Sequence, residues 1–447
     1  MGDLAFVSSW VRPEGTFRLH QRDIPLALIV AYAIALLAIP SDVGLQLGAL
    51  VLSPSRFILG ALAVLVVVDG SLRDALRSAP KAVLVAWLAF LASAGVTTVL
   101  HFSSQAFSRY GSLVFEGLVL WLVVWCVLRD RRGAHALQLT IVVTTSFVAG
   151  ATLLLAVLGL GYGDVFRSLS GLTVEPSTDI RFGLSRQEGS FPAPLFFATW
   201  LAGASMLILC WLEDERPLRR ILAWAAWVIL LLAAVMTVSR VGIVVVLAGT
   251  GVYFLLRRRP RIGIVMIALA LIVALIMAGL TGPSFFPSNT GSSAPASAPA
   301  SAPPAQTEEE VALTGSTTLR IEAIKAAWPV LLKKPLFGYG LLSAGPVISA
   351  ATGRPNYIDD TYVEYLVELG VLGFAAFALL LLATLGRAVR LPWSPVHISR
   401  MLALGVLLGM AAFASFLSIT QGYAAFVLLL ALVTIGAPAA HTDTRSA

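Results

Sequence analysis

Charge is scarce in this sequence of 447 residues, of which only 12% are charged and 58% are hydrophobic. Such a chain cannot cover a soluble fold with polar surface, and its mean hydropathy of +0.88 is typical of membrane proteins. Cysteine is scarcer still: Cys126 and Cys210 both fall inside apolar stretches, which excludes a disulfide framework and a cysteine-rich metal cluster. The five histidines are scattered, and only His101 is expected outside the membrane. We therefore expect no structural disulfide and no zinc, and we assign no cofactor.

Long apolar runs are what the sequence does contain, and they predict an all-α polytopic membrane protein with about 12 transmembrane helices. The expected spans cover approximately residues 24–39, 55–69, 82–100, 111–128, 136–160, 192–212, 219–237, 241–256, 262–280, 361–385, 399–417 and 420–437. The organisation that follows is a cytoplasmic segment 1–23, spans 1–9 over 24–280, a large extracytoplasmic loop 281–360, spans 10–12 over 361–437 and a cytoplasmic tail 438–447.

The basic residues predict the orientation, because short cytoplasmic loops carry an excess of lysine and arginine. With the N-terminus inside, the internal segments hold about two thirds of the 31 basic residues. Both termini are therefore expected in the cytoplasm. The net charge of +7 comes mostly from these inner loops, so it does not indicate a nucleic-acid partner.

The large loop 281–360 divides into parts of different composition. A tract over 288–307 rich in serine, alanine and proline has too few large apolar residues to offset the entropy of ordering, so we expect it to be disordered. Helical spacing of apolar residues then predicts an amphipathic helix over about 316–334, which Lys333-Lys334-Pro335 ends. This helix can rest on the membrane surface with basic side chains beside the lipid headgroups.

Arg240 is the first candidate functional residue. It lies in Thr-Val-Ser-Arg-Val-Gly between two apolar stretches, with only a few residues available for the turn. A guanidinium cannot lose its proton, so its position at membrane depth is costly unless it meets an anion or water. An anionic substrate is therefore a plausible partner.

Three further clusters on the same expected side of the membrane combine ionisable residues with glycine or proline. They are Arg186-Gln-Glu-Gly-Ser-Phe-Pro192; Arg320 with Lys325, followed by Pro335-Leu-Phe-Gly-Tyr-Gly340; and Asp359-Asp360-Thr-Tyr362, followed by Glu364, Glu368, Gly370 and Gly373. Arginine offers two parallel donors to phosphate oxygens, so such a set can bind a diphosphate and stabilise it as it departs. A carboxylate beside the acceptor can take the hydroxyl proton as general base. Together these parts are compatible with glycosyl transfer from a polyprenyl diphosphate.

Structural roles remain open for the same residues. Arg186 and Arg320 also suit a solvated loop, and either Asp359 or Asp360 can cap the following helix at its N-terminus. Glu364 and Glu368 share a helix face at i, i+4 and repel each other if both are charged. One of them is therefore expected to be buried in neutral form or paired with an arginine.

The order of these motifs resembles the O-antigen ligase and O-antigen polymerase superfamily of bacterial envelope glycosyltransferases. The resemblance covers roughly residues 186–375. The elements that carry it are Arg186-Gln-Glu-Gly189-Ser-Phe191; Ser239-Arg240-Val-Gly242; Arg320, Trp328 and Pro335-Leu-Phe-Gly338-Tyr-Gly340; and Asp359-Asp360-Thr-Tyr362-Val followed by Glu368-Leu-Gly370 and Gly373.

The resemblance implies an inverting, metal-independent transfer of a glycan from undecaprenyl diphosphate to the hydroxyl of a glycan or lipid-linked acceptor. It implies that Arg186, Arg240 and Arg320 hold the diphosphate, and that the last motif supplies the base from among Asp359, Asp360 and Glu368. Asp359 departs from the family pattern, which has histidine at this position. An aspartate still accepts a proton, so the expectation is broadened to a polysaccharide ligase or polymerase.

Other functions are compatible with parts of this pattern. A transporter or flippase of a lipid-linked or anionic substrate would use Arg240 in a central cavity, although no internal repeat is evident. Transferases that use polyprenyl monophosphate sugars commonly place essential carboxylates in the first external loop, where this chain has only Asp42. A catalytically silent glycan-binding homologue is a further alternative because of Asp359.

Overall fold

Apolar runs separated by proline, glycine and charged residues form helices throughout the computed structural model of this chain. The structure describes residues 23–47, 50–128, 131–169, 180–181, 184–279, 324–353 and 360–435. Up to residue 185 its elements are α2 (Asp23–Ala38), β1 (Leu45–Leu47), β2 (Leu50–Leu52), α3 (Pro54–Val68), α4 (Ser71–Ser78), α5 (Lys81–Leu100), α6 (Ser104–Leu113), the π-helical turn η1 (Val114–Val119), α7 (Leu120–Val127), α8 (Arg131–Val157), α9 (Tyr162–Leu169), β3 (Ile180–Arg181) and β4 (Leu184–Ser185).

The second part of the chain is also helical. Its elements are α10 (Pro194–Leu212), α11 (Pro217–Met236), α12 (Arg240–Leu256), α13 (Pro260–Gly279), a helical segment over 324–333, α15 (Ala344–Thr352), α16 (Thr361–Val389), α17 (Pro395–Ala411), the short 3₁₀ turn η2 (Phe416–Ser418) and α18 (Thr420–Thr434). The four short strands form two antiparallel pairs, β1 with β2 and β3 with β4. Proline occupies the first turn of α3, α10, α11 and α17, where its missing amide proton costs no hydrogen bond.

Each expected membrane span falls on an apolar helix or a continuous run of helices. In the described part of the chain, six helical runs are long and apolar enough to cross a bilayer, or seven if α3 and α4 form one span bent by 91°. The six are α5, the run α6–η1–α7, α8, α10, α11 and α16; shorter apolar helices are α2, α12, α13, α17 and α18. The all-helical membrane architecture is thus confirmed, and the count of 12 spans stays a prediction.

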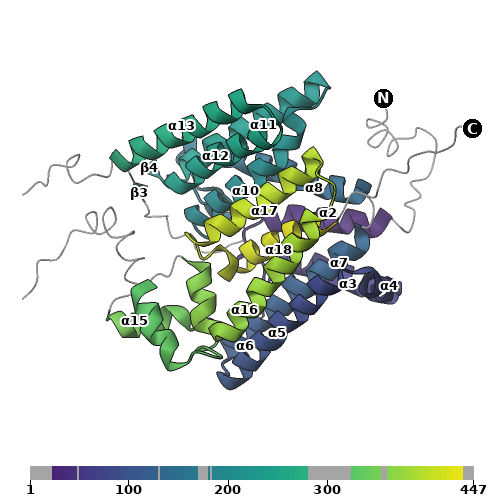
Figure 1. Cartoon of the computed structure of the whole chain (residues 1–447), viewed down its shortest axis with the longest axis vertical. Helices are drawn as coiled ribbons and strands as arrows, with labels where there is room; N and C mark the ends of the chain where they lie inside the picture. The colour runs from purple at the N-terminus through teal and green to yellow at the C-terminus, as the bar shows by residue number, and fades with distance from the viewer. Residues whose placement is uncertain are drawn as a thin grey trace, which may run out of the picture.

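The centre of the molecule is made by α10 and α18. Of the most apolar part of α10, 78% is buried, and this helix contacts α8, α11, α12 and α17. In α18 the buried residues run without interruption from Gln421 to Thr434. A helix that is apolar all round belongs inside a bundle, because no face of it suits a polar surface. In Figure 1, α11, α12 and α13 lie on one side of this centre and α5, α6 and α16 on the other.

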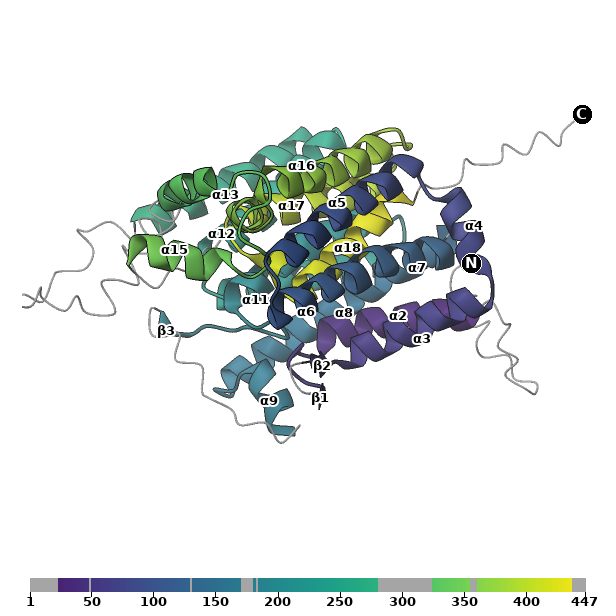
Figure 2. The same cartoon turned by 90° about the horizontal axis from the view of Figure 1, so that it is seen from below.

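The bundle has two distinct ends. Figures 1 and 2 both show β3 and α15 at one end and α4 at the opposite end. The described segments that carry the family resemblance lie toward the end with α15. The basic residues Arg73 and Arg77 belong to α4.

Candidate functional site

Arg186 and Arg240 are brought to one place by the turn between α11 and α12. The Arg186 guanidinium is buried, and its Nε donates a hydrogen bond of 3.0 Å to the carbonyl oxygen of Thr237. The Gln187 amide donates to the carbonyl oxygen of Met236 at 3.2 Å. The strand-like segment before α10 is therefore attached to the turn that leads into Arg240, although 54 positions separate the two arginines in the sequence.

The turn itself is tight, as its sequence predicts. Three residues, 237–239, separate α11 from α12, and Val238 has a left-handed backbone with φ of 52°. Thr237 stabilises the turn: its Oγ1 donates to the Ala234 carbonyl at 2.7 Å and accepts from the Ser239 amide at 3.2 Å. A left-handed β-branched residue is strained, which is a feature that clusters at functional sites.

Arg240 is the first residue of α12 and is half-buried. The N-terminus of a helix presents amide protons and a partial positive charge, so a cation at this position is unfavourable for the isolated helix. The same arrangement is favourable once an anion is present, because the amides and the guanidinium then act on it together. The turn is chemically suited to bind phosphate or diphosphate.

Aromatic packing connects the Arg186 segment to η2. The Phe191 ring lies 6.0 Å from the ring of Phe416 and 6.3 Å from that of Trp200, measured between centroids. Ser190 Oγ donates to the carbonyl oxygen of Leu37 at 2.6 Å, which ties the same segment to the end of α2. The segment is thus held by three different parts of the bundle.

The other end of η2 holds the acidic helix α16. Ser418 Oγ donates to the Glu364 carboxylate, and the Tyr365 hydroxyl donates to the Leu417 carbonyl at 3.2 Å. Thr361 Oγ1 donates to the carbonyl of Ala414 at 2.9 Å. A single short turn therefore joins the arginine-bearing segment to the first two turns of α16.

Asp360 caps α16. Its Oδ1 accepts hydrogen bonds from the amides of Tyr362 at 2.8 Å and Val363 at 3.2 Å. The capping role that the sequence left open for one of the two aspartates is thus confirmed for Asp360. Asp359 and Arg320 lie outside the described residues.

Arg109 of α6 is a buried arginine that sequence reasoning did not single out. It is 8% exposed, its Nη2 donates to the Leu417 carbonyl at 2.8 Å, and its guanidinium lies 5.8 Å from the Tyr423 ring centroid. It interacts electrostatically with Glu364 and Glu368. Arg109 is therefore an arginine that interacts with the glutamate pair, and the neutral or paired state of one glutamate stays a prediction. Its position two residues before the expected span 111–128 was the available signal.

Glu368 is held at the start of α15. Its side chain is 3% exposed, and it interacts with the backbone amides of Leu342 and Ala344. Ala344 is the first residue of α15, so the carboxylate lies at the positive end of a helix. The two amides and the helix end therefore orient this carboxylate inside an otherwise apolar region.

The Pro335–Gly340 motif pairs with a break in α16. Backbone amides of Tyr339 and Gly340 donate to the carbonyls of Val367 and Glu368 at 3.0 and 2.9 Å. In return the Val371 amide donates to the Pro335 carbonyl at 2.8 Å. The third and fourth sequence clusters, separated by about 30 residues, are thus one structural unit.

Two glycines make this pairing possible. Gly338 has φ of 63°, and a Cβ there would lie 2.5 Å from the carbonyl oxygens of Val367 and Glu368. Gly370 has φ of 66°, and its Cβ would lie 2.5 Å from the Leu336 carbonyl oxygen. Both the backbone conformation and the close approach exclude any other residue without rearrangement.

The loop is also tied to the end of α5. Lys334 Nζ lies 3.0 Å from His101 Nε2 and 4.9 Å from the Tyr339 ring centroid. Lys334 immediately precedes the Pro335–Gly340 motif. The histidine expected outside the membrane therefore positions this loop.

The helical segment 324–333 has two different faces. Ala327 and Val330 are buried against Ile348 of α15 and Val367 of α16. Ile324, Trp328 and Leu332 recur at four-residue spacing and are exposed. The described part of the expected amphipathic helix is therefore amphipathic, and residues 316–323 lie outside the described residues.

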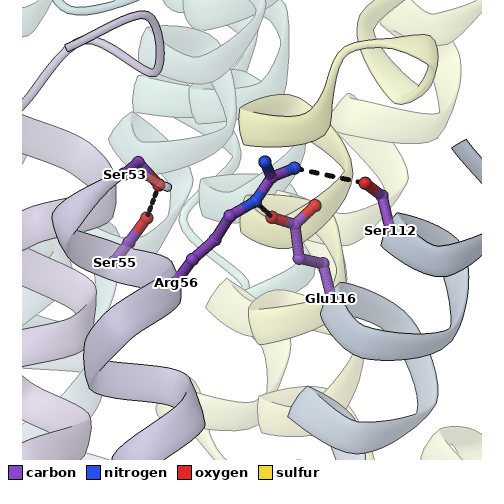
Figure 3. Close-up of polar contacts among 5 residues, drawn as sticks. All are labelled: Ser53, Ser55, Arg56, Ser112 and Glu116. Carbon is purple, nitrogen blue, oxygen red and sulfur yellow. Dashed lines mark hydrogen bonds and ion pairs between the residues drawn. The ribbon is translucent and has the colours of Figure 1, made fainter. Parts of the chain in front are cut away.

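A second ionic cluster lies between α3 and η1 (Figure 3). Arg56 Nε donates to Glu116 Oε1 at 2.8 Å and its Nη2 donates to Ser112 Oγ at 3.2 Å. The two charged side chains are 17% and 5% exposed. Beside them the hydroxyls of Ser53 and Ser55 are hydrogen-bonded to each other at 2.9 Å. Glu116 also interacts with Arg109, so this ion pair borders the site.

We expect Arg56 and Glu116 to depend strongly on each other. Either Arg56→Met or Glu116→Met should lower the free energy of unfolding by about 3 kcal/mol or more, because each leaves the other charge buried without its partner. The double substitution should cost less than the sum of the two. Chemical denaturation of the four proteins in detergent measures this coupling, and strictly additive costs would contradict it.

Asp42 of the first loop has a structural role. The Arg167 Nε donates to Asp42 Oδ2 at 2.8 Å, while its Nη1 donates to Asp164 Oδ1 at 3.2 Å. These contacts connect α9 to the loop after α2. The carboxylate that a monophosphate-dependent transferase would need in this loop is thus engaged in an ion pair.

Comparison with known proteins agrees with the resemblance seen in the sequence. Residues 225–378 match the family model described as O-antigen ligase. The matched segment contains Arg240, the Pro335–Gly340 motif and Glu368. No curated protein matches the chain significantly. Residues 225–378 are thus similar to the O-antigen ligase family, and the apolar helices are those of a multi-pass membrane protein.

Proposed function

We propose that this protein transfers or polymerises a glycan from undecaprenyl diphosphate onto an acceptor hydroxyl at the extracytoplasmic face of the inner membrane. The observation that carries the proposal is the attachment of Arg186 to the turn that begins α12 at Arg240. Two arginines and a helix N-terminus suit a diphosphate leaving group, whose charge increases as its bond to the sugar breaks. Arg320 is proposed as the third arginine of this set.

The acidic part of the site is proposed to activate the acceptor. The acceptor oxygen attacks the anomeric carbon from the face opposite the diphosphate, which inverts the configuration there. The hydroxyl proton passes to a carboxylate, and the bond to the diphosphate breaks without a metal ion. Asp359 is the proposed base. Asp360 is engaged as a helix cap, and Glu368, oriented by two amides, is proposed to position the acceptor or the base.

The membrane arrangement proposed with this function has 12 spans and cytoplasmic termini. The five shorter apolar helices and the bent pair α3–α4 would supply the spans beyond the six long ones. Arg73 and Arg77 of α4, at the end opposite α15, suit the cytoplasmic side. The motif-bearing end would then face outward, where the lipid-linked glycan is presented.

The family match favours this activity over the alternative of a transporter or flippase. A transporter needs a central site that is alternately open to the two sides. Here α10 and α18 occupy the centre as buried apolar helices.

The test is glycan transfer by the purified protein from undecaprenyl diphosphate oligosaccharides, with EDTA present. Arg240→Ala should lower the rate by on the order of 10² or more, because it removes charge stabilisation of the departing diphosphate. Arg240→Lys should also be impaired, since lysine lacks the bidentate fork, and Asp359→Asn should lose the base. Arg390→Lys is the control, because Arg390 is exposed at the far end of α16.

Two results would refute the proposal. The wild-type protein would fail to turn over across a panel of donors and acceptors, or Arg240→Ala and Asp359→Asn would both retain full activity. Size-exclusion profiles and thermal unfolding of each variant separate loss of the fold from loss of chemistry.

A further inference from the structure

His101 contacts both ends of the Pro335–Gly340 motif. It directly follows the last residue of α5, and its Nε2 lies 3.0 Å from Nζ of Lys334, which immediately precedes the motif. At the other end, a Cβ at Gly340 would lie 2.8 Å from Cβ of His101, so the backbone of the motif packs directly against this side chain. One histidine therefore closes a loop whose backbone is hydrogen-bonded to the break in α16.

The contact with Lys334 determines the protonation state of the ring. A lysine ammonium has three donors and no acceptor, so His101 Nε2 must accept the hydrogen bond and the ring proton must lie on Nδ1. The imidazole is therefore neutral while Lys334 is bound. Nδ1 is buried, and within the described part of the chain it donates to no acceptor, so no hydrogen-bonded carboxylate there offsets a positive charge on the ring.

Lys334 also contacts an aromatic ring of the motif. Its Nζ lies 4.9 Å from the Tyr339 ring centroid, and the Tyr339 hydroxyl donates to the Val330 carbonyl at 3.0 Å. The amide of Tyr339 donates to the Val367 carbonyl of α16. Displacement of the lysine therefore disturbs a residue through which the motif pairs with α16.

The other charged groups around His101 belong to the two helices packed against α5 and to the segment before the motif. They are Arg109 of α6, Glu364 and Glu368 of α16, and Lys333. Arg109 interacts with both glutamates, and Lys333 is exposed. Lys334 makes the hydrogen bond with the ring, so a proton gained by His101 acts first on Lys334.

We propose that His101 is a proton-sensitive positioning residue of the transfer site. In its neutral form it accepts from Lys334 and keeps the motif against α16. In its protonated form it places a second cation 3.0 Å from the ammonium and releases the motif. Histidine is the residue type whose charge changes between about pH 8 and pH 5, so attachment should be lost as the pH falls through this range. The effect on transfer rests on the proposed function, and the effect on the loop does not.

Hydrogen exchange of the Tyr339 and Gly340 amides tests the proposal without turnover, because both donate to carbonyls of α16. In the wild type their protection, corrected for the intrinsic pH dependence of exchange, should fall about tenfold from about pH 7.5 to about pH 5.5. Two unit charges at this separation repel by an amount that corresponds to about a factor of ten even in water. In His101→Gln protection should stay constant, because the amide oxygen accepts from Lys334 at either pH and gains no proton.

Two further variants accompany this measurement. His135→Gln is the matched control, since His135 is exposed on α8 with its ring against Trp211, and it should show the wild-type response. Lys334→Met serves if His101→Gln does not fold. Without the ammonium a protonated ring has no cation to repel, so protection should again change little with pH.

The rate of glycan transfer is the second readout. A proposed base such as Asp359 is also protonated in acid, and equally so in both proteins, so the ratio of the His101→Gln rate to the wild-type rate isolates the histidine. This ratio should be higher at about pH 5.5 than at about pH 7.5. Thermal unfolding at both pH values separates release of the loop from loss of the fold.

The outcomes distinguish this proposal from the proposed function. Protection of the two amides that does not change with pH in the wild type, or an equal loss in acid in His101→Gln, would overturn the role of His101. A loss in acid that His101→Gln abolishes would support it. If the wild type then transferred no glycan at any pH, that result would count against the proposed function and leave the contact established.

Discussion

Replacing Arg109 with methionine is expected to destabilise the protein severely and to remove transfer activity. The guanidinium bonds to the Leu417 carbonyl and faces Glu364 and Glu368, which are close together on α16. Its loss takes the donor from the buried Leu417 carbonyl and the positive charge from beside two buried carboxylates, which should cost about 1–3 kcal/mol or more. The change is measured as the free energy of unfolding in detergent, together with the transfer rate.

A second substitution tells whether charge is the cause. Arg109→Met combined with Glu364→Gln should recover part of the lost stability, because one of the two uncompensated charges is then gone. Arg109→Lys should lie between wild type and Arg109→Met, since the charge stays while the planar fork is lost. Equal stability of wild type and Arg109→Met would show that the arginine is not needed to hold α16 against η2.

Replacing Gly370 with alanine is expected to detach the Pro335–Gly340 motif from α16. The backbone at Gly370 has φ of 66° and ψ of −173°, a region that only glycine occupies readily. The added methyl group would also lie 2.5 Å from the Leu336 carbonyl oxygen. Because this pairing orients Glu368 and the start of α15, transfer should fall by on the order of 10² through misplacement alone.

Gly386→Ala is the control within the same helix. No described atom lies within 4 Å of its would-be Cβ, so alanine should be neutral or slightly stabilising there. Hydrogen exchange of the 336–340 amides provides the structural readout, because those of Tyr339 and Gly340 are bonded to α16. Retained protection and full activity in Gly370→Ala would contradict the role of the break.

These two predictions concern contacts between segments far apart in the chain, and that is where sequence reasoning was weakest. Arg109 lies more than 250 residues from the glutamates that it faces. Arg56 and Glu116 meet across 60 positions. Period and composition carry no information about which faces of two helices meet, so the sequence predicted neither Arg109 as the arginine beside the glutamates nor the pairing of Arg56 with Glu116.

Local features, such as helix positions, a tight turn and a helix cap, could by contrast be predicted from the sequence. The apolar runs predicted the positions of the helices, because a helix satisfies its own backbone hydrogen bonds and so can cross apolar surroundings. The three-residue turn before Arg240 was predicted because two apolar runs leave room for nothing longer. The cap at Asp360 follows from a carboxylate directly before an apolar helix.

The glycines show which features could be predicted from local sequence and which required the tertiary structure. Gly338, Gly370 and their neighbours were visible as a motif, and the family match over residues 225–378 covers them. Their purpose became clear only from the backbone pairing of residues 335–340 with the break in α16. A glycine pattern in a sequence indicates that another group approaches the backbone closely, but it does not identify the segment to which that group belongs.

For this protein, helix positions, membrane character and the resemblance to the O-antigen ligase family were determined by residue order, since they depend on interactions within about one or two helix turns or on motifs of a few residues. The assembly of the site depended on packing: η2 joins Phe191 to Glu364, Thr237 receives Arg186, and α15 meets Glu368. Those contacts depend on which apolar helices pack together. Helix packing is decided by the complementary shapes of many side chains from several segments, so no single segment of the sequence predicts it.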